Sequence, residues 1–306
     1  MASISPIPRA RLSELDFDVP ELEQIGTQGD PLIGRSLGKY RIERRLGMGP
    51  WGIAYLAAHE ITKKSFAVKV LAENLTVSHV QARRFVREAR LTAPLQHENI
   101  RQIFDVDNES GLYYLVMEYV VGSGLQALVY KNRTIASDTA ARIVAQASTG
   151  LAFALARGII HADVRPRNIL VSREGVVKVT DFGLCVNVYE TPERILNDPI
   201  VRSPEFMSPE HFANWELDQR SDIYSLGSSF YYMLTGRTPF QAADPHTLMW
   251  RQKNEDPPSP REFNAKLPLS ICSIVLKMLE WDPFDRYQQY EDLVAEIETY
   301  LEETGA

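Results

Sequence analysis

Three oxygen-bearing side chains recur at short spacing in the second half of the sequence. Asp163 and Asn168 lie five residues apart in IIHADVRPRNILV, and Asp181 follows in TDFG. Two carboxylates and one amide form a suitable donor set for a hard cation such as Mg²⁺, which also binds the phosphate oxygens of a substrate. Each residue alone could instead serve a turn or a helix cap, but the three together favour a site for a metal and a phosphate.

A glycine-rich segment offers a second contact to phosphate. Gly47, Gly49 and Gly52 form GMGPWG between two predicted strands. Glycine allows the backbone to approach phosphate oxygens without interference from a side chain. The same glycine motif precedes the first helix of dinucleotide-binding folds, but here a strand follows where such a fold needs a helix. The segment therefore favours a hairpin over a dinucleotide site.

Lys69 lies in FAVKV, a strand that Phe66, Val68 and Val70 predict to be buried. A buried cation requires an anion, because an unpaired desolvated charge is costly. Glu88, on the next predicted helix, is the expected partner. The alternative is a surface lysine at a strand edge.

The elements that position these residues follow from the hydrophobic pattern. A helix is predicted over 79–95, and after Gly124 the pattern is mainly helical, beginning with 138–157. Five short segments rich in β-branched and aromatic residues predict strands over 40–46, 52–60, 64–71, 101–108 and 112–120. The sequence thus predicts an α+β protein with a small strand-rich lobe and a larger helical lobe.

Composition excludes several other classes of protein. The 306 residues include 33 basic and 40 acidic side chains, a net charge of −7, which disfavours binding to nucleic acid. No apolar stretch reaches the length of a membrane span. The first residues carry Pro6, Pro8 and charges where a signal peptide would be apolar. With only Cys185 and Cys272, we expect reduced thiols and a cytoplasmic location.

Residues 1–37 mix prolines, glycines and acidic side chains with isolated apolar positions, among them Leu12 and Phe17. Pro20 interrupts any helical stripe. Two interpretations follow: a largely disordered tail, or a segment that packs back on the folded domain and positions or regulates it.

Taken in order, these motifs resemble those of the eukaryotic-like (Hanks-type) protein kinases, and most of all the bacterial serine/threonine protein kinases. The resemblance covers residues 40–300. Beyond the glycines, Lys69, Glu88 and the three oxygen donors, it rests on the following matches: His161, Phe182, Gly183, Ser208, Pro209, Glu210, Asp222 and Arg286.

The resemblance implies a bilobal protein kinase fold with an ATP cleft between the lobes. A five-stranded antiparallel N-lobe with one inserted helix would occupy 38–117, a hinge 118–122 and a mainly helical C-lobe 123–302. The kinase domain would therefore span 38–302 and follow an N-terminal extension over 1–37. Glu210 would pair with Arg286 and buttress the segment that holds a polypeptide substrate.

The resemblance also implies the roles of single residues. Lys69, held by Glu88, would bind the α and β phosphates of ATP, while Asn168 and Asp181 would hold Mg²⁺, with Mn²⁺ as an alternative. Asp163 would accept the proton of the acceptor hydroxyl, Arg165 would stand near the γ-phosphate, and Ser203 would line the pocket for the protein substrate. The rest of the ATP site would comprise Leu46, Gly47, Gly49, Gly52, Ala54, Ala67, Met117, Glu118, Val120 and Leu170.

Three departures from the family pattern affect regulation and rate. Ala162 replaces the arginine of the family's His-Arg-Asp (HRD) motif, which commonly binds a phosphate on the activation segment. We therefore expect activity without phosphorylation of that segment. Arg165 replaces a lysine, a change that could slow the enzyme. Arg167 replaces the glutamate of basophilic kinases and predicts neutral or acidic target sequences, unless it points to solvent.

The leading functional hypothesis is an ATP-dependent protein kinase that acts on Ser/Thr hydroxyls. A pseudokinase, acting as a nucleotide-binding scaffold, is the alternative that Ala162 and Arg165 suggest. A small-molecule phosphotransferase is disfavoured by the peptide-binding apparatus over 203–210.

Overall fold

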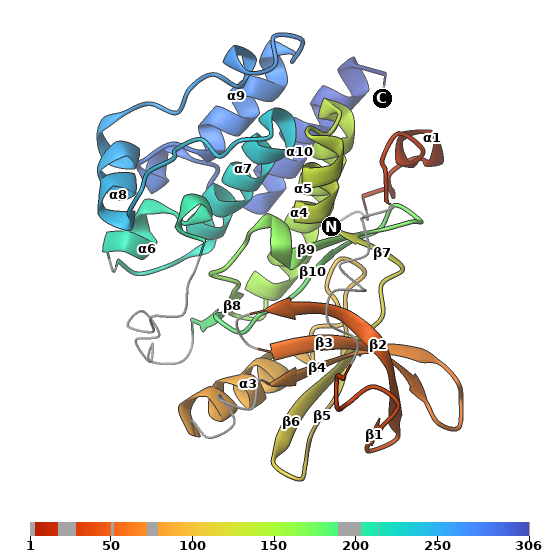
Figure 1. The fold of residues 1–306 in the computed structure, drawn as a ribbon. Coiled ribbons are helices and arrows are strands. Elements are labelled where there is room, and N and C mark those ends of the chain that lie inside the picture. Colours follow the sequence, from red (N-terminus) through yellow and green to blue (C-terminus); the bar gives the residue numbers. More distant parts are fainter. Residues whose placement is uncertain are drawn as a thin grey trace. The chain divides into compact units, whose positions relative to one another are not determined.

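The chain forms two compact units, each described separately below (Figure 1). The computed structural model describes residues 4–17, 29–49, 52–71, 79–188, 203–213 and 215–305, without the side chains of 79–81 and 84. The sheet unit comprises 18–97 and 101–121, and the helical unit comprises 1–17, 98–100 and 122–306.

The sheet unit is built on one antiparallel sheet with the strand order β1-β2-β3-β4-β6-β5. The five predicted strands and the inserted helix are confirmed, and a short β1 precedes them. The helix ends at Thr92 rather than at residue 95, since Pro94 disfavours helical backbone before it. The elements are β1 (Ser36–Leu37), β2 (Tyr40–Gly49), β3 (Gly52–His59), β4 (Ser65–Leu71), α3 (His79–Thr92), β5 (Ile103–Glu109) and β6 (Leu112–Glu118).

Side chains on β4 alternate between the two faces of this sheet. Val68 and Val70 join an apolar cluster with Tyr55 on one face. Leu71 belongs to a second cluster, to which α3 contributes Phe85 and two alanines. Lys69 alternates with the valines, so its side chain is on the α3 side of the sheet.

Residues just before the predicted kinase domain are part of the sheet unit. Asp30 pairs with Arg45 at 2.6 Å and accepts a hydrogen bond from the Tyr55 hydroxyl at 3.1 Å. Leu32 and Ile33 pack against the first apolar cluster. The fold of this unit therefore begins before residue 38.

The helical unit contains most of the helices and two small sheets, with strand orders β10-β9-β7 and β11-β8. Its helices are α1 (Arg9–Leu12), α4 (Leu125–Asn132), α5 (Ser137–Leu155), α6 (Pro209–Ala213), α7 (Gln219–Thr235), α8 (Pro245–Asn254), α9 (Leu269–Met278) and α10 (Tyr290–Glu303). Its strands are β7 (Gly122–Gly124), β8 (Ile159–Ile160), β9 (Ile169–Ser172), β10 (Val177–Val179) and β11 (Val186–Asn187), and its 3₁₀ turns are η2 (Pro166–Asn168), η4 (Pro204–Phe206), η5 (Pro260–Glu262) and η6 (Pro283–Asp285).

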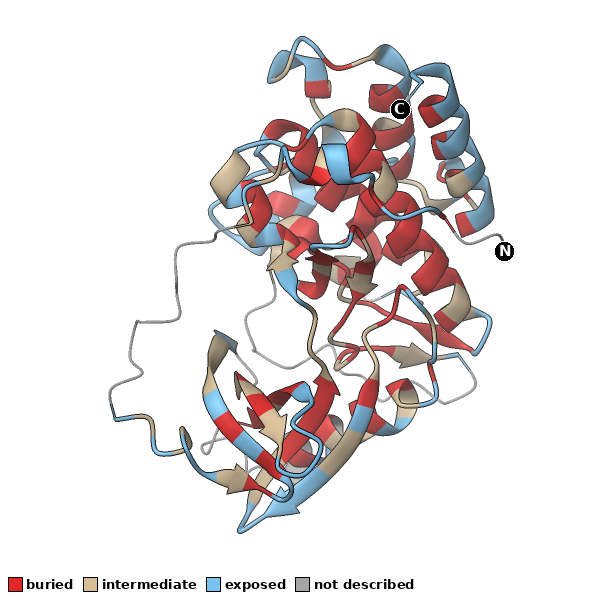
Figure 2. Ribbon diagram, turned by 90° about the vertical axis from the view of Figure 1, so that its right-hand side faces the viewer, coloured by how far each residue is buried: buried red, intermediate tan, exposed pale blue. Residues whose placement is uncertain are grey.

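Two long helices, α5 and α7, form the centre of the helical unit. Nearly all residues of both helices are buried, and α7 carries Asp222 in its first turn (Figure 2). Helix α5 packs against α7 and α10, and α7 packs against α9. Among the described residues, no helix is both long enough and apolar enough to cross a membrane.

Residues 4–17 pack on the helical unit. Ile4, Ile7 and Leu12 are buried, and the backbone N–H of Ile7 donates to the carbonyl of Gly175 at 3.0 Å. Gly175, in the turn between β9 and β10, has a φ of 85°, and a Cβ there would overlap the backbone of Ile7. The turn thus requires glycine both for its conformation and for the close approach of this segment.

Polar contacts extend this docking along the segment. Arg11 pairs with Asp138, in the first turn of α5, at 2.5 Å. Asp16 pairs with Lys131 at 3.2 Å, and its backbone N–H donates to the Asn132 side chain at 3.0 Å. These contacts hold residues 4–17 against the helical unit, while residues 18–28 lie outside the described part of the chain.

We predict that Ile7→Ala destabilises the protein by about 2–4 kcal/mol, because a buried isoleucine loses its packing against the helical unit. Arg9→Ala, at an exposed neighbour in the same segment, is the matched control and should have little effect. Urea unfolding and hydrogen exchange of residues 4–17 measure the change. Equal stability of the two variants would show that the segment is not docked in solution.

Candidate functional site

In the sheet unit, the glycine-rich segment forms the ends of β2 and β3. Gly47 lies opposite Ala54, and Gly49 lies opposite Gly52. Gly52 has a φ of 149°, and a Cβ at this position would overlap the Val70 carbonyl oxygen. A Cβ at Gly47, by contrast, would meet open space. The backbone at Gly47 is thus accessible to a phosphate, while Gly52 permits close packing of the hairpin on β4.

The predicted ion pair forms inside the sheet unit. The Nζ of Lys69 lies 3.6 Å from a carboxylate oxygen of Glu88, and their side chains are only 15% and 5% exposed. Lys69 lies opposite Ala54 on β3 and Leu115 on β6. These apolar neighbours limit the access of water to the pair, and the contact with Glu88 restricts the position of the Lys69 ammonium group.

The residues expected around the adenine base divide between the two units. Ala67 is fully buried opposite Met117, and Leu46 and Ala54 are partly buried on β2 and β3. Leu170, on β9, is a partly buried residue of the helical unit.

The hinge contains a contact that the sequence did not indicate. The Nε of Arg101 donates to the carbonyl oxygen of Glu118 at 2.8 Å, just where β6 ends. A carbonyl oxygen has two lone pairs and can accept more than one hydrogen bond. Val120 follows Glu118 and is partly buried.

In the helical unit, Asp163 and Asn168 come together in the loop between β8 and β9, and Asp181 follows β10. The Asn168 amide nitrogen donates to the Asp163 backbone oxygen at 2.8 Å and to its carboxylate at 3.0 Å. The Thr180 backbone N–H donates to the Asn168 carbonyl at 2.9 Å, which places Asp181 one residue away from this contact.

This donor set fits Mg²⁺. Since Asn168 donates its amide nitrogen to Asp163, a cation would bind its side-chain oxygen, and the carboxylate of Asp181 is an oxygen donor of the same hard class. Within the described ranges, no group of three or more His, Cys, Asp or Glu side chains could hold a metal ion. In proteins Mg²⁺ is usually bound by one or two carboxylates together with phosphate oxygens of the substrate.

Two residues of this region have left-handed backbone. Ala162 has a φ of 58° and Asp181 a φ of 67°. Such a conformation costs a residue other than glycine about 1–2 kcal/mol, so neighbouring contacts must stabilise it.

Asp222 supplies this stabilisation for Ala162. Its two carboxylate oxygens accept the backbone N–H groups of His161 and Ala162, each at 2.8 Å. Burial raises the pKa of Asp222 to about 7, although these donors and the Tyr290 hydroxyl act to lower it. The first turn of α7 thus fixes the backbone just before Asp163.

His161 is also a structural residue. Its Nδ1 accepts the Asp163 backbone N–H at 3.2 Å, and its Nε2 lies 3.1 Å from the Thr180 carbonyl. Since a carbonyl only accepts, Nε2 carries the proton. Burial lowers the pKa of His161 to about 4, so the ring is neutral at pH 7.

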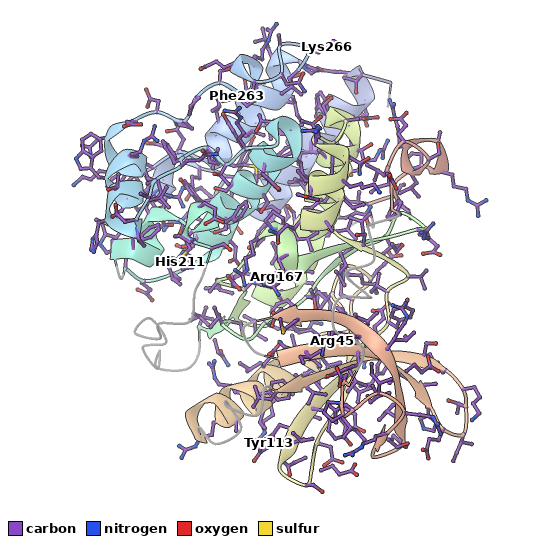
Figure 3. The ribbon with its side chains drawn as sticks, viewed as in Figure 1. Arg45, Tyr113, Arg167, His211, Phe263 and Lys266 are labelled. Carbon is purple, nitrogen blue, oxygen red and sulfur yellow. The ribbon has the colours of Figure 1, made fainter. Side chains whose placement is uncertain are left out.

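Arg165 links the catalytic loop, residues 161–168 between β8 and β9, to the residue expected at the acceptor pocket. One guanidinium nitrogen donates to the Ser203 hydroxyl at 3.1 Å, and another lies 3.4 Å from the Asp163 carboxylate. Arg165 is buried, whereas Arg167, which is labelled in Figure 3, is exposed. The two arginines of this loop therefore have different surroundings.

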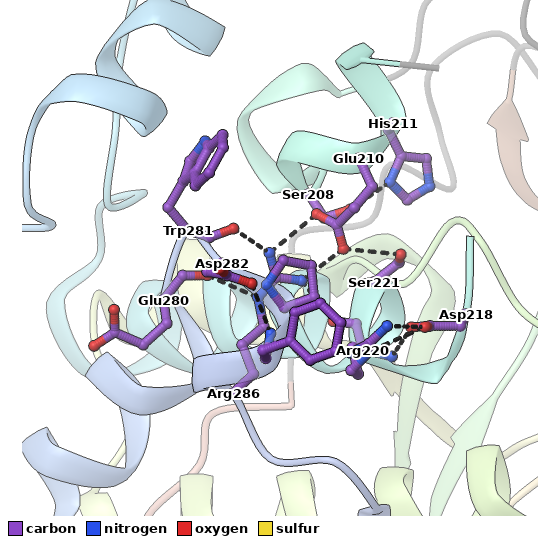
Figure 4. Close-up of polar contacts among 12 residues, drawn as sticks. Ser208, Glu210, His211, Asp218, Arg220, Ser221, Glu280, Trp281, Asp282 and Arg286 are labelled. Carbon is purple, nitrogen blue, oxygen red and sulfur yellow. Dashed lines mark hydrogen bonds and ion pairs between the residues drawn. The ribbon is translucent and has the colours of Figure 1, made fainter. Parts of the chain in front are cut away.

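The predicted pair between Glu210 and Arg286 is confirmed. It is bidentate, at 2.7 and 3.0 Å, and Ser221 donates to the same carboxylate at 3.0 Å (Figure 4). Burial alone would raise the pKa of Glu210, but the hydrogen bonds and charge of Arg286 outweigh it, and the pKa lies below its usual value. Arg286 also donates to the carbonyls of Glu280 and Trp281.

The sequence interpretation missed His211. Its Nδ1 lies 2.8 Å from the Ser208 hydroxyl, and its Nε2 lies 3.0 Å from the carbonyl of Ala162. Sequence spacing gave no ligand pattern for this histidine. The available signal was its position directly after Ser208-Pro209-Glu210, where a side chain can reach the catalytic loop.

We predict that Arg286→Met destabilises the protein by about 3–5 kcal/mol at pH 7, because Glu210 is left as an unpaired buried carboxylate. In the wild type, the pKa of Glu210 is lowered, so the ion pair contributes its full stabilisation at pH values above the ordinary glutamate pKa. This stabilisation is lost as the pH falls through the lowered pKa. The difference between variant and wild type should therefore shrink on acidification.

Urea unfolding at successive pH values below 7 tests this, with Arg261→Met, at an exposed arginine, as the control. A difference that stays constant down to acid pH would contradict the account of the pair.

Comparison with known proteins places the chain in a family. A family model for the protein kinase domain matches residues 40–296. The chain is 35% identical over 269 residues to the serine/threonine-protein kinase PrkC of Bacillus subtilis, covering 88% of this chain and 41% of PrkC. It is 36% identical over 262 residues to the serine/threonine-protein kinase Pkn1 of Myxococcus xanthus, covering 84% and 38%. The chain thus spans about two fifths of the length of these relatives.

A solved structure supports the same assignment at the level of the fold. The kinase domain of PknI from Mycobacterium tuberculosis, solved as a single-site mutant, matches with a TM-score of 0.68 and 23% identity, covering 87% of this chain and 97% of that chain. The family match over 40–296 shows that the chain belongs to the protein kinase domain family.

Proposed function

We propose that this chain is an ATP-dependent protein kinase that transfers the γ-phosphate to Ser or Thr hydroxyls of protein substrates. The observation that carries the proposal is the environment of Asp163. Asn168 and His161 hold this residue in place, and Arg165 joins it to Ser203. A carboxylate held in this way, beside a hydroxyl of the substrate-binding segment, is suited to accept the proton of an incoming hydroxyl.

The sheet unit supplies the groups that would hold ATP. Lys69, fixed by Glu88, would neutralise the α and β phosphates, while the backbone at Gly47 and Gly49 would cover them. A bound Mg²⁺ would neutralise charge on the phosphates, and Asn168 and Asp181 would hold it. Mg²⁺ is proposed from the hard oxygen donors and from the resemblance, with Mn²⁺ as the alternative. A role in signalling is proposed from the resemblance, and a cytoplasmic location from the two cysteines and the polar N-terminal residues.

In the transfer step, Asp163 would orient the substrate hydroxyl and take its proton as the bond from the hydroxyl oxygen to the γ-phosphorus forms. The bond from the γ-phosphorus to the β–γ bridging oxygen breaks at the same time, and ADP leaves. Arg165 would place positive charge near the phosphoryl oxygens. Because the transition state for phosphoryl transfer is loose, most of the rate enhancement comes from positioning and charge stabilisation. Fixed side chains such as Asp163 and Lys69 meet this requirement.

The preference for Ser and Thr over Tyr rests on Ser203 and on the relatives. Ser203 replaces the threonine that lines the acceptor pocket in serine/threonine kinases, and Arg165 binds it. The relatives PrkC and Pkn1 are serine/threonine kinases by name. We also propose that this is a non-RD kinase, a kinase without an arginine directly before the catalytic aspartate. Ala162 stands at that position and has no cationic side chain to bind a phosphate on the activation segment.

Asp163→Asn tests the activity most directly. We expect it to lower phosphate transfer by at least about 100-fold, because the amide cannot accept the hydroxyl proton. Radiolabelled ATP, a generic acceptor protein and phosphoamino-acid analysis give the rate and the acceptor residue, and ATP affinity should remain close to wild type. Tight ATP binding by the wild type without any transfer would instead favour the pseudokinase scaffold.

We further predict that treating the enzyme with a broad-specificity phosphatase leaves its activity unchanged. Between Gly183 and Ser208 the hydroxyl-bearing side chains are those of Tyr189, Thr191 and Ser203, and the first two lie outside the described part of the chain. Mass spectrometry before and after treatment reports their modification. Loss of activity together with loss of a Thr191 phosphate would contradict the non-RD assignment.

A further inference from the structure

His211 connects the substrate-binding end of the activation segment to the catalytic loop. It is 4% exposed, and it lies on the short helix α6, directly after Glu210. Its Nε2 is 3.0 Å from the Ala162 carbonyl, an atom that can only accept a hydrogen bond. Nε2 therefore carries a proton, and in the neutral ring Nδ1 accepts the hydroxyl hydrogen of Ser208 at 2.8 Å.

The group that His211 holds is the peptide bond immediately before Asp163. The carbonyl oxygen of this peptide accepts from His211, and its N–H donates to Nδ1 of His161 at 3.2 Å. A peptide unit is planar and rigid, so hydrogen bonds at both of its polar atoms fix its plane. The plane in turn restricts the direction in which the Asp163 side chain leaves the backbone.

Ala162 needs these contacts because its backbone is left-handed, with a φ of 58°. Asp222 accepts the N–H of the peptide unit before Ala162, and His211 donates to the carbonyl of the unit after it. Removing either contact would release one side of a conformation that alanine alone disfavours.

We propose that His211 is a positioning residue for Asp163. Through its Nε2–H it ties the catalytic loop to the segment from Ser203 to Ser208. The proposal rests on the proposed kinase function. This tie uses the backbone carbonyl at position 162 and requires no phosphate, whereas the family's HRD arginine commonly ties the loop through a phosphate. The Arg165 contact to Ser203 provides a second, parallel connection between the same two segments.

A matched pair of variants separates this role from simple packing. In His211→Gln the side-chain nitrogen can reach the position of Nε2 and donate to the Ala162 carbonyl. In His211→Asn the shorter amide can only replace Nδ1, and it retains a contact to Ser208 alone. His211→Leu fills the same space without hydrogen bonds. Packing alone would not make Gln the better replacement.

We expect His211→Asn and His211→Leu to lower kcat by about 10- to 100-fold, because a small misplacement of a catalytic group is costly. His211→Gln should recover most of the wild-type kcat. The KM for ATP should change by less than about twofold in all three, since the altered contact acts on the chemical step and not on nucleotide binding. Equal kcat values for the Gln and Asn variants would overturn the proposal.

Hydrogen exchange gives a readout that does not depend on catalysis. Amides of residues 161–164 should exchange faster in His211→Asn than in His211→Gln, while those of α5 should be unchanged. If the wild type transfers no phosphate but the exchange difference is present, the proposed function fails and the positioning contact stands. If exchange over 161–164 is the same in the two variants, the positioning role is contradicted whatever the activity.

Discussion

The catalytic loop depends on one buried carboxylate, that of Asp222. A carboxylate in the apolar centre of a helical unit is strongly disfavoured unless donors surround it. The donors are the backbone N–H groups of His161 and Ala162, and Ala162 is the residue with left-handed backbone. The helix and the loop therefore require each other: the loop satisfies the buried charge, and the charge stabilises a backbone that alanine does not favour.

The other contacts of the site extend from this backbone. His161, held through its N–H, accepts the N–H of Asp163, and Asn168 binds the Asp163 carboxylate. Arg165 and His211 connect the same loop to Ser203 and Ser208. The bidentate pair of Glu210 and Arg286 then fixes α6 in the core, one residue before His211. A continuous set of short contacts thus runs from α7 to the substrate-binding segment.

Much of this could be predicted from the sequence, because strands, helices and kinase motifs have local signals. The pairs of Lys69 with Glu88 and of Glu210 with Arg286 followed from burial or from the resemblance. The docking of Ile7 and Arg11 did not follow from either signal. Ile7 is an isolated apolar residue between two prolines, which gives no periodicity, and the partners of both residues lie more than a hundred residues away in the sequence. His211 and Arg101 were missed for a different reason. Each binds a backbone carbonyl, and every residue has one, so the sequence does not indicate which carbonyl a side chain will bind.

The central claim is that the fixed loop around Asp163 performs phosphate transfer to a hydroxyl and does more than bind a nucleotide. The most direct measurement is a single-turnover experiment with the wild-type protein, ATP and Mg²⁺, using peptides that differ only in having Ser, Thr or Tyr as the acceptor. The account predicts rapid formation of phosphoserine or phosphothreonine, with the tyrosine peptide far slower. Saturable ATP binding with no phosphopeptide formed from any of the three would contradict it.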